Sequence, residues 1–237
     1  MLNQRKKELL EAIIKEYIKT AQPVGSGLVV DKYKFGLSPA TIRNEMAALL
    51  ADGYISQPHT SAGRVPTEKA YKFFAGSLSV KKIKPFVLPE EFARLADEDV
   101  RFAIKQLAKL AAEFTGEAVF AAFGKNDFYY TGISNLFSKP EFSSPEIIVN
   151  ISAVIDAMDE AIGGIFGKFE NLESASAVGG GIKVLIGSDN PFSPQCSVIL
   201  ARWSSKGAEG LIGILGPLRM DYEKNLGAVK ELEILLK

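Results

Sequence analysis

The sequence predicts an α+β protein with two domains, and three features lead to this prediction. The chain has 237 residues, which suits one large domain or two ordinary ones, and 47% of them are hydrophobic, enough to build a buried core. Residues 1–76 follow the order helix, helix, turn, helix, strand, loop, strand, helix. Residues 90–237 contain apolar strand patterns joined mostly by short turns and flanked by helices, which is typical of an antiparallel sheet. Residues 77–89 are then expected to be a linker.

The two predicted domains differ in charge, although the formal net charge of the chain is zero. Residues 1–85 contain 14 Lys and Arg against 7 Asp and Glu, whereas residues 86–237 contain 14 against 21. A basic first third predicts a polyanionic partner for that part of the chain. The same excess can also arise by chance, so the fold of the first domain has to decide.

Residues 3–20 are predicted to form an amphipathic helix. Apolar side chains recur there every four residues in two series, Leu9, Ile13 and Tyr17, and Leu10, Ile14 and Ile18. Ser26 is predicted to cap a short second helix, 27–34. Gly36 follows it and can take the left-handed conformation that a sharp exit needs.

A third helix is predicted from Pro39, because Ser38 can cap it and proline suits the first helical position. Ile42, Met46 and Leu49 form its inward stripe, and Gly53 follows its end. The next segments are a short strand at 54–57, the loop "QPHTSAGRVPT" (57–67), a return strand at 64–66 and a helix capped by Thr67. This order predicts a winged helix-turn-helix.

A recognition helix presents its N-terminal side chains to base edges in the major groove of DNA. Thr41, Arg43 and Asn44 suit that task, since Arg can bond two acceptors of guanine, Asn can pair with adenine, and the Thr methyl can touch a thymine methyl. The alternative is that Arg43 and Asn44 only solvate the helix. The capped turn before them and the basic domain favour DNA reading.

The loop 57–67 is the predicted wing. Gly63 and Ala62 let a backbone pass close to a groove, and Thr60 and Ser61 can donate hydrogen bonds to phosphate. Arg64 can enter a minor groove or hold a phosphate with two hydrogen bonds.

His59 is the only histidine of the chain. A metal site would need a second histidine or a nearby cysteine, and a catalytic pair would need Cys196, which lies in an apolar strand pattern. A wing or structural histidine is therefore the favoured interpretation, with no metal, no cofactor and no enzymatic activity expected. A single cysteine, no signal peptide and no run of 18 apolar residues predict a cytoplasmic protein without a membrane span.

The second domain is predicted to begin with a helix from Pro89 to about 115. Its apolar face is predicted to comprise Val100, Ala103, Leu107, Leu110 and Phe114. Strands are expected at 117–123 and 128–137, followed by a helix at about 145–169 with a possible strand at 146–151. Three more strands, 179–187, 195–203 and 209–216, precede a final helix at 220–236 capped by Asp221.

Residues 38–74, "SPATIRNEMAALLADGYISQPHTSAGRVPTEKAYKFF", closely resemble the signature of the HrcA family, the heat-inducible transcription repressors. "PVGS" (23–26) fits the entry to the second helix of that family. "VLIGSDNP" (184–191) and "IGILGPLRMDYEKNL" (212–226) resemble a second block of it near the C-terminus. The resemblance is dense over residues 1–75, patchy from 90 to 180, and recovers after that.

The resemblance implies a repressor that binds, as a homodimer, an inverted-repeat operator in double-stranded DNA upstream of chaperone operons. It implies a GAF-like second domain, 90–237, with a regulatory and dimerisation role, and a GroEL chaperonin that assists the repressor into its active form. The middle region is too short for the full segment that typical members insert there. By resemblance, the operator is faced by Ser38, Thr41, Arg43 and Asn44, with His59, Thr60, Ser61 and Arg64 in the wing.

One alternative function stays open from the sequence. A winged-helix regulator can also sense a metabolite through a small-molecule-binding C-terminal domain. A saturable thermal shift with a small ligand, absent with chaperonin, would favour that alternative.

Overall fold

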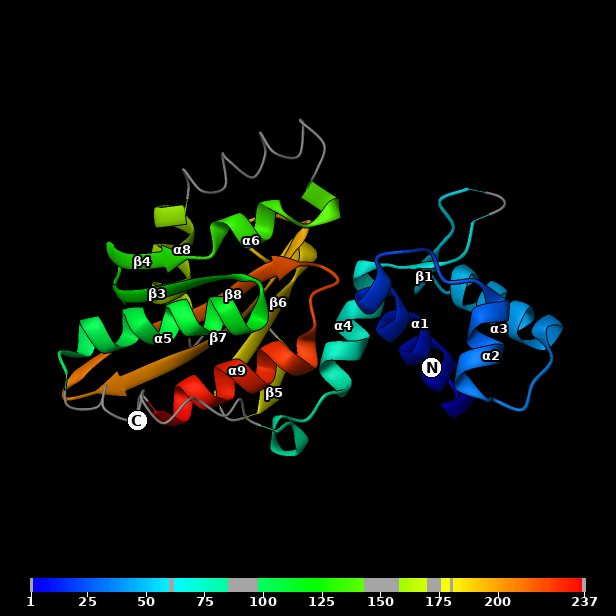
Figure 1. Cartoon of the computed structure of the whole chain (residues 1–237), viewed down its shortest axis with the longest axis horizontal. Coiled ribbons are helices and arrows are strands. Elements are labelled where there is room, and N and C mark those ends of the chain that lie inside the picture. Colours follow the sequence, from blue (N-terminus) through cyan, green and yellow to red (C-terminus); the bar gives the residue numbers. More distant parts are fainter. Residues whose placement is uncertain are drawn as a thin grey trace. The chain divides into compact units, whose positions relative to one another are not determined.

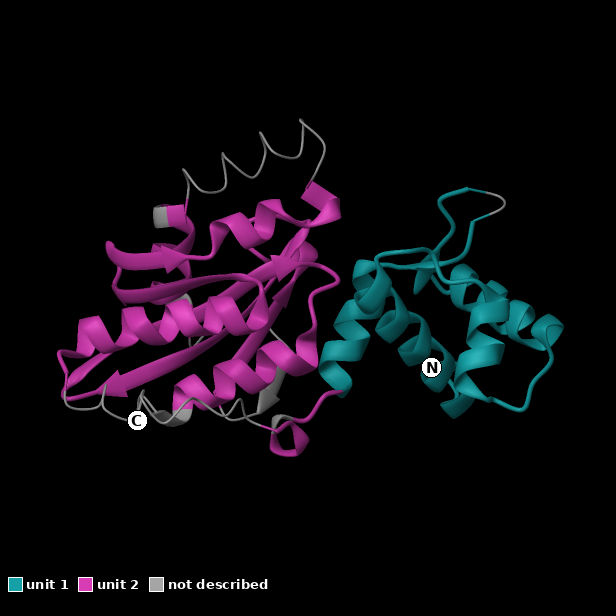
Figure 2. Ribbon diagram, in the orientation of Figure 1, with its two compact units in different colours: residues 1–77 teal, residues 78–237 magenta. Residues whose placement is uncertain are grey.

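A computed structural model of the chain describes residues 2–59, 62–84, 98–142, 158–169, 176–179 and 181–235. The chain forms two compact units, Met1–Ser77 and Leu78–Lys237 (Figure 2). Each unit is described by itself below, as unit 1 and unit 2.

Unit 1 is a winged helix-turn-helix, as the order of elements predicted (Figure 1). Three helices precede two short antiparallel strands, and a fourth helix follows them. The elements are α1 (Gln4–Thr20), α2 (Ser26–Tyr33), α3 (Pro39–Ala51), β1 (Ile55–Ser56), β2 (Val65–Pro66) and α4 (Glu68–Ser77).

The ends of these helices follow local signals, with one exception. Ser38 caps α3 by accepting a hydrogen bond from the Thr41 backbone, and Gly36 has φ +66° as predicted. Thr67 Oγ1 accepts from the Ala70 backbone at 3.4 Å and so caps α4. The prediction that Ser26 caps α2 was wrong, because Ser26 is the first helical residue and Gly25 stands at the cap without a side-chain hydrogen bond.

The core of unit 1 is formed by the inward stripes of its helices. Ile42, Met46 and Leu49 of α3 are buried as predicted. They belong to a core that includes Leu9, Leu10, Ile13, Ile14, Val29, Ile55, Tyr71 and Phe74. This packing fixes which face of α3 remains available to solvent.

Unit 2 is built on a six-stranded antiparallel sheet with the order β4-β3-β8-β7-β6-β5. Every neighbouring pair in this sheet is antiparallel, which confirms the predicted α+β class and is consistent with a GAF-like domain. The strands are β3 (Ala118–Gly124), β4 (Asp127–Thr131), β5 (Ser176–Gly179), β6 (Ile182–Ile186), β7 (Cys196–Ser205) and β8 (Ala208–Pro217).

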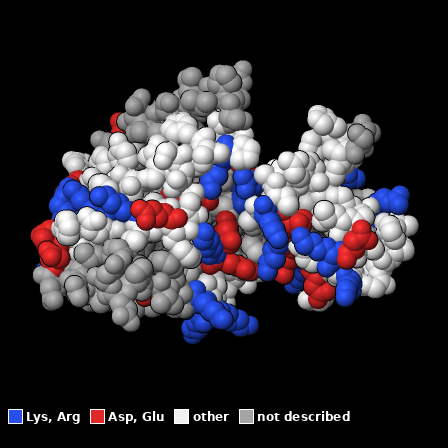
Figure 3. All heavy atoms as spheres, in the orientation of Figure 1, with Lys and Arg blue, Asp and Glu red and all other residues white. Residues whose placement is uncertain are grey.

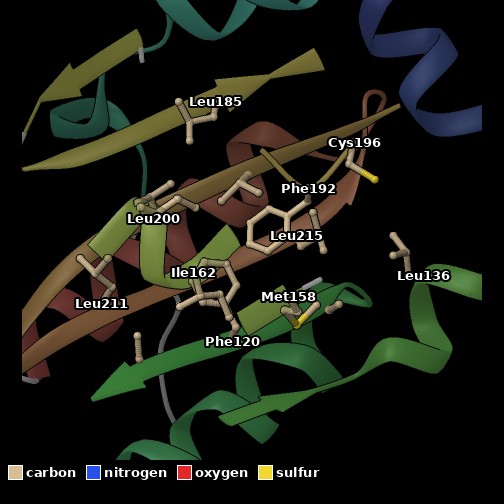
Figure 4. Close-up of a cluster of buried hydrophobic side chains, with 14 of the residues drawn as sticks. Phe120, Leu136, Met158, Ile162, Leu185, Phe192, Cys196, Leu200, Leu211 and Leu215 are labelled. Carbon is tan, nitrogen blue, oxygen red and sulfur yellow. The ribbon is translucent and has the colours of Figure 1, made fainter. Parts of the chain in front are cut away.

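Helices cover both faces of this sheet. The helices α5 (Val100–Thr115) and α9 (Tyr222–Leu235) cross one face (Figure 1), where Ser197 of β7 hydrogen-bonds to Tyr222 of α9 at 2.8 Å. Side chains of α6 (Ile133–Phe137) and α8 (Met158–Lys168) pack on the other face, where Leu136, Met158 and Ile162 meet strand residues such as Phe120 (Figure 4).

Two features of unit 2 differ from what the sequence predicted. The strand predicted at 128–137 ends at Thr131, because Gly132 (φ +72°) is the N-cap of the helix α6. The side-chain amide of Asn135 in α6 donates to the carbonyls of Ala112 and Glu117. Strand β5 was not predicted. The strand at 146–151 lies outside the described residues, and the helix at 145–169 is described from Met158.

The buried face of α5 is rotated from the predicted one. Ile104, Ala108 and Ala111 are buried together with Ala103 and Leu107, whereas Val100, Leu110 and Phe114 are only half-buried. Small alanine side chains face the sheet there. The sequence prediction was based mainly on large apolar residues and therefore did not place Ala108 and Ala111 on the buried face.

The predicted linker, 77–89, is described as far as Lys84, with Val80–Lys82 forming a 3-10 turn. Lys230 of α9 donates to the Ile83 carbonyl at 3.0 Å, so this segment packs on unit 2. Asp221 caps α9 as predicted, accepting from the Lys224 backbone at 3.0 Å.

Candidate nucleic-acid interface

The first turn of α3 is held by two hydroxyl side chains. Ser38 Oγ accepts a hydrogen bond from the Thr41 backbone at 3.1 Å and lies 3.0 Å from Thr41 Oγ1. Both hydroxyls are therefore engaged with each other and with the start of the helix. Their contribution is to fix the direction in which α3 begins, since a capped first turn does not fray.

The exposed face of α3 includes a stripe formed by Ala40, Arg43, Asn44 and Ala47. This is the i, i+3, i+4, i+7 spacing of one helical face, opposite the buried Ile42 and Met46 stripe. The sequence predicted Arg43 and Asn44 on this side but did not indicate the two alanines. Small side chains next to longer polar ones let a helix approach a surface closely while the polar groups reach forward.

Glu45 follows Asn44 on α3 and is tied to another helix. It forms an ion pair with Arg5 of α1, and its side chain is 12% exposed. The acidic group next to the exposed stripe is thus neutralised within the unit. The polar groups left on the stripe are Arg43 and Asn44, so the stripe is basic.

The base of the wing is anchored to the loop between α1 and α2. Strand β2 pairs with β1, and Arg64, just before β2, exchanges two backbone hydrogen bonds of 2.8 Å with Val24. A Cβ added to Gly63 would lie 2.6 Å from backbone atoms of Pro23 and Val24. Gly63 is therefore required for contact with the protein's own backbone, whereas the sequence suggested that it makes room for a groove.

The turn of the wing is held by hydrogen bonds between residues close in sequence. The Ala62 backbone donates to the His59 carbonyl at 2.9 Å, and the Ala62 carbonyl accepts from the side chains of Gln57 (3.1 Å) and Arg64 (3.2 Å). His59 is exposed at this turn. Thr60 and Ser61 lie outside the described residues, so their assignment to the DNA-facing surface stays a prediction.

A pocket of about 300 Å³ lies where the wing base, the start of α2 and the face of α3 meet. Its lining includes Gly25 and Ser26 of the α2 start, Arg43 of α3, and Gln57, Gly63 and Arg64 of the wing. Arg43 and Arg64, which the sequence assigned to separate parts of the interface, therefore line one cavity. Gly25, Ser26 and Gln57 were not predicted as site residues, although "PVGS" marked the first two as part of a motif.

The basic excess is less concentrated than the sequence count suggested. Unit 1 contains 11 Lys and Arg against 7 Asp and Glu, because Lys81, Lys82 and Lys84 belong to unit 2. On the face shown in Figure 3, basic and acidic side chains of unit 1 alternate. On this face unit 1 therefore shows no broad surface of one charge sign.

The second reactive group considered from the sequence is unsuited to catalysis. Cys196 is buried at the start of β7, and burial raises the pKa of its thiol to about 12. It remains protonated at neutral pH, and the thiolate is the nucleophilic form. Cys196 packs with Phe192 and Val198 in the core of unit 2, as the apolar pattern around it indicated.

Two family models match the chain. "Winged helix-turn-helix transcription repressor, HrcA DNA-binding" matches residues 1–79, and "HrcA protein C terminal domain" matches residues 69–226. The chain belongs to the HrcA family. Its winged helix is thus the DNA-binding domain of a family of heat-inducible transcription repressors, and membership does not favour the metabolite-sensing alternative. No helix in the described ranges has the length and hydropathy needed to cross a membrane.

Individual relatives agree with this assignment. The heat-inducible transcription repressor HrcA of Beutenbergia cavernae is 46% identical over 119 residues, which are 48% of this chain and 33% of that protein. The heat-inducible transcription repressor HrcA of Natranaerobius thermophilus is 27% identical over an alignment that covers 98% of this chain and 95% of that protein. A crystal structure of a hypothetical protein shares the fold, with a TM-score of 0.73 at 20% identity, over 99% of this chain and 96% of that one.

Proposed function

We propose that the protein is a cytoplasmic repressor of heat-shock operons, which encode chaperones. It binds an inverted-repeat operator as a homodimer. Heat and the GroEL chaperonin modulate its activity. Unit 1 reads the operator and unit 2 serves regulation and dimerisation. The residues assigned to the DNA-facing surface are Ser38, Thr41, Arg43, Asn44, His59, Thr60, Ser61 and Arg64.

The observation that carries this proposal is the exposed stripe of α3 beside a wing that is fixed at its base. Arg43 and Asn44 are exposed on the first two turns of a capped helix, which is the part of a recognition helix that contacts bases. The Val24–Arg64 backbone pair holds the wing base against the same side of unit 1. A helix and a wing in fixed relation can engage a major groove and the adjacent backbone together.

Dimerisation is proposed because of the symmetry of the expected operator. One α3 covers one half-site, so an inverted repeat requires two copies related by a two-fold axis. The alignment with the Natranaerobius thermophilus relative is 325 positions long and this chain has 237 residues, so at least 88 alignment positions have no counterpart here. This supports a reduced insertion compared with that relative.

Heat control is proposed to act through the folded fraction of the repressor. A domain with marginal stability changes its folded fraction several-fold for a change of about 1–2 kcal/mol in the free energy of unfolding. Warming would then lower the amount of folded, active repressor, and chaperonin would restore it. Chaperone genes would be expressed whenever chaperonin is occupied elsewhere.

The test is a binding titration on DNA. Fluorescence anisotropy with duplexes from the organism's own chaperone promoters is compared with scrambled duplexes, with and without chaperonin, before and after a heat pulse. Selective binding that heat abolishes and chaperonin restores supports the proposal. Equal affinity for both duplexes would overturn operator recognition, and a monomer in sedimentation on the operator would overturn the dimer. A saturable thermal shift with a small metabolite would instead support the sensing alternative.

A further inference from the structure

The pocket between α2, α3 and the wing contains the two arginines of the described chain that have no acidic partner. Of the six arginines in the described residues, four form an ion pair with a carboxylate. These pairs are Arg5–Glu45, Arg101–Asp127, Arg202–Glu209 and Arg219–Glu141. The remaining two, Arg43 and Arg64, both line the same pocket of about 300 Å³. No carboxylate side chain lines it.

We infer that this pocket holds a single DNA backbone phosphate, clamped between Arg43 and Arg64. The inference rests on the proposed function and sharpens it, because it makes Arg43 a backbone contact and leaves Asn44 as the polar base-reading group of the exposed stripe. Two guanidinium groups around one site without a carboxylate repel each other unless an anion lies between them, and a phosphate accepts several of their hydrogen bonds at once.

Arg64 is prepared for such a contact. Its backbone is fixed by the two 2.8 Å hydrogen bonds to Val24, and its side chain is half-buried and steadied by the 3.2 Å hydrogen bond from one terminal nitrogen to the Ala62 carbonyl. Its Nε is buried and has no hydrogen-bond acceptor in the described structure. A guanidinium with a fixed position loses less conformational entropy when it binds an anion.

The start of α2 supplies further donors to the same pocket. Gly25 is the N-cap and makes no side-chain hydrogen bond, so the first backbone N–H groups of α2 are left without a side-chain cap. A Cβ added at Gly25 or Gly27 would meet nothing within 4 Å, so this backbone is open to approach. N–H groups at a helix start favour an anion, and the Ser26 hydroxyl lines the pocket beside them.

The inference changes what the removal of Arg43 should do. A base-reading arginine confers discrimination, so its loss would lower affinity for the operator more than for a scrambled duplex. A phosphate-binding arginine confers affinity without sequence preference, so its loss would weaken binding to both duplexes by the same factor. The two roles are thus distinguished by the ratio of two affinities.

The experiment uses the full chain with Arg43→Gln, Arg64→Gln and the double variant, which remove the charge and keep most of each side chain. Lys19→Gln is the matched control, since Lys19 is an exposed cation of unit 1 that does not line the pocket. Affinities for operator and scrambled duplexes are measured by anisotropy over a series of salt concentrations. Circular dichroism establishes that each variant is folded.

We expect Arg43→Gln to weaken both duplexes equally and leave the operator-to-scrambled ratio unchanged. In the double variant the slope of log K against log salt should fall by about 0.9, the value for one phosphate, rather than by about 1.8. Lys19→Gln should leave the slope unchanged. A loss of the affinity ratio in Arg43→Gln, or a slope change of two phosphates in the double variant, would overturn the inference.

A second measurement does not depend on how well the variants fold. Neutral methylphosphonate linkages are introduced one at a time along the half-site, and each modified duplex is titrated with wild type and double variant. One linkage should weaken the wild type and leave the double variant unaffected. If no linkage behaves in this way, or if the two single variants respond to different linkages, the shared clamp is wrong.

The outcomes separate this inference from the proposed function. Equal binding of operator and scrambled DNA by the wild type refutes operator recognition, while the methylphosphonate result still tests the clamp. Inorganic phosphate at matched ionic strength distinguishes a free anion from the phosphodiester. If phosphate binds the wild type but not the double variant and leaves the affinity for DNA unchanged, the pocket is a free-phosphate site and the inferred DNA clamp is overturned.

Discussion

Replacement of Glu117 by glutamine should stabilise unit 2 at alkaline pH and have little effect at acid pH. Glu117 precedes β3, and its residue is 4% exposed. One carboxylate oxygen accepts from Lys139 Nζ at 3.2 Å, and the other is buried without a hydrogen-bond partner in the described structure. Burial raises the pKa of this carboxyl from 4.5 to about 7, against the opposing effects of Lys139 and Arg219.

The magnitude follows from that change in pKa. A rise from 4.5 to about 7 corresponds to about 3 kcal/mol, at ~1.4 kcal/mol for each pH unit between the two values. Below pH 4.5 the carboxyl is protonated in the folded and the unfolded chain, and its full contribution to stability is present. That contribution is lost as the pH rises from 4.5 to about 7, because the unfolded chain then releases a proton that the buried carboxyl of the folded protein retains. Glutamine resembles the protonated carboxyl and avoids this loss.

The assay is urea unfolding of wild type and Glu117→Gln between pH 5 and 8.5, followed by tryptophan fluorescence. Trp203 is the single tryptophan and is buried in β7, so the signal reports on unit 2. The free energy of the variant minus that of the wild type should rise by about 2–3 kcal/mol over this range. The exposed Glu113 of α5 provides the control Glu113→Gln. A difference for Glu117→Gln that stays constant with pH would refute the reasoning.

Three further predictions concern unit 1. Asn44→Ala should lower the preference for operator over scrambled DNA by about 1–3 kcal/mol, measured by competition anisotropy, and an unchanged preference would remove Asn44 from base reading. Ser38→Ala removes the cap of α3 and should cost about 1 kcal/mol, detected as a lower melting temperature by far-ultraviolet circular dichroism. Gly63→Ala forces a Cβ to within 2.6 Å of the Pro23–Val24 backbone and should weaken operator binding by about 1–3 kcal/mol. The control is Gly76→Ala, where a Cβ meets nothing within 4 Å, and it should leave operator binding unchanged.

The parts of unit 1 that the sequence predicted correctly are those determined by local signals. Ser38 and Pro39 define the start of α3 through one hydrogen bond and one fixed dihedral angle, and both are visible in four residues of sequence. Ser26 has the same chemistry but does not cap α2, because Gly25 is extended (ψ 154°) and takes the cap position. Ser38 is followed by Pro39, which marks the first helical position, whereas Ser26 is followed by Gly27 and lacks this second signal.

In unit 2 the errors come from long-range packing. Residues 128–137 are rich in aromatic and β-branched residues and resemble one strand, yet the chain turns at Gly132, where a Cβ would meet the Glu117 carbonyl at 2.6 Å. Asn135 then bonds two carbonyls from other elements. A strand prediction depends on side-chain patterns, and these contacts become visible only after β3 and α5 are in place.

The same limit explains why the sequence did not show that two of the predicted DNA-facing residues line one pocket. Arg43 belongs to a helix and Arg64 to a wing 21 positions later, so local patterns assign them different tasks, base reading and phosphate binding. Gly63 connects them, because its missing Cβ allows the wing base to lie against Pro23 and Val24, next to the start of α2. That contact brings Arg64 into the pocket that Arg43 also lines. A glycine needed for contact with its own chain thereby determines which two arginines line one pocket, and any assignment of a role to either arginine has to consider both.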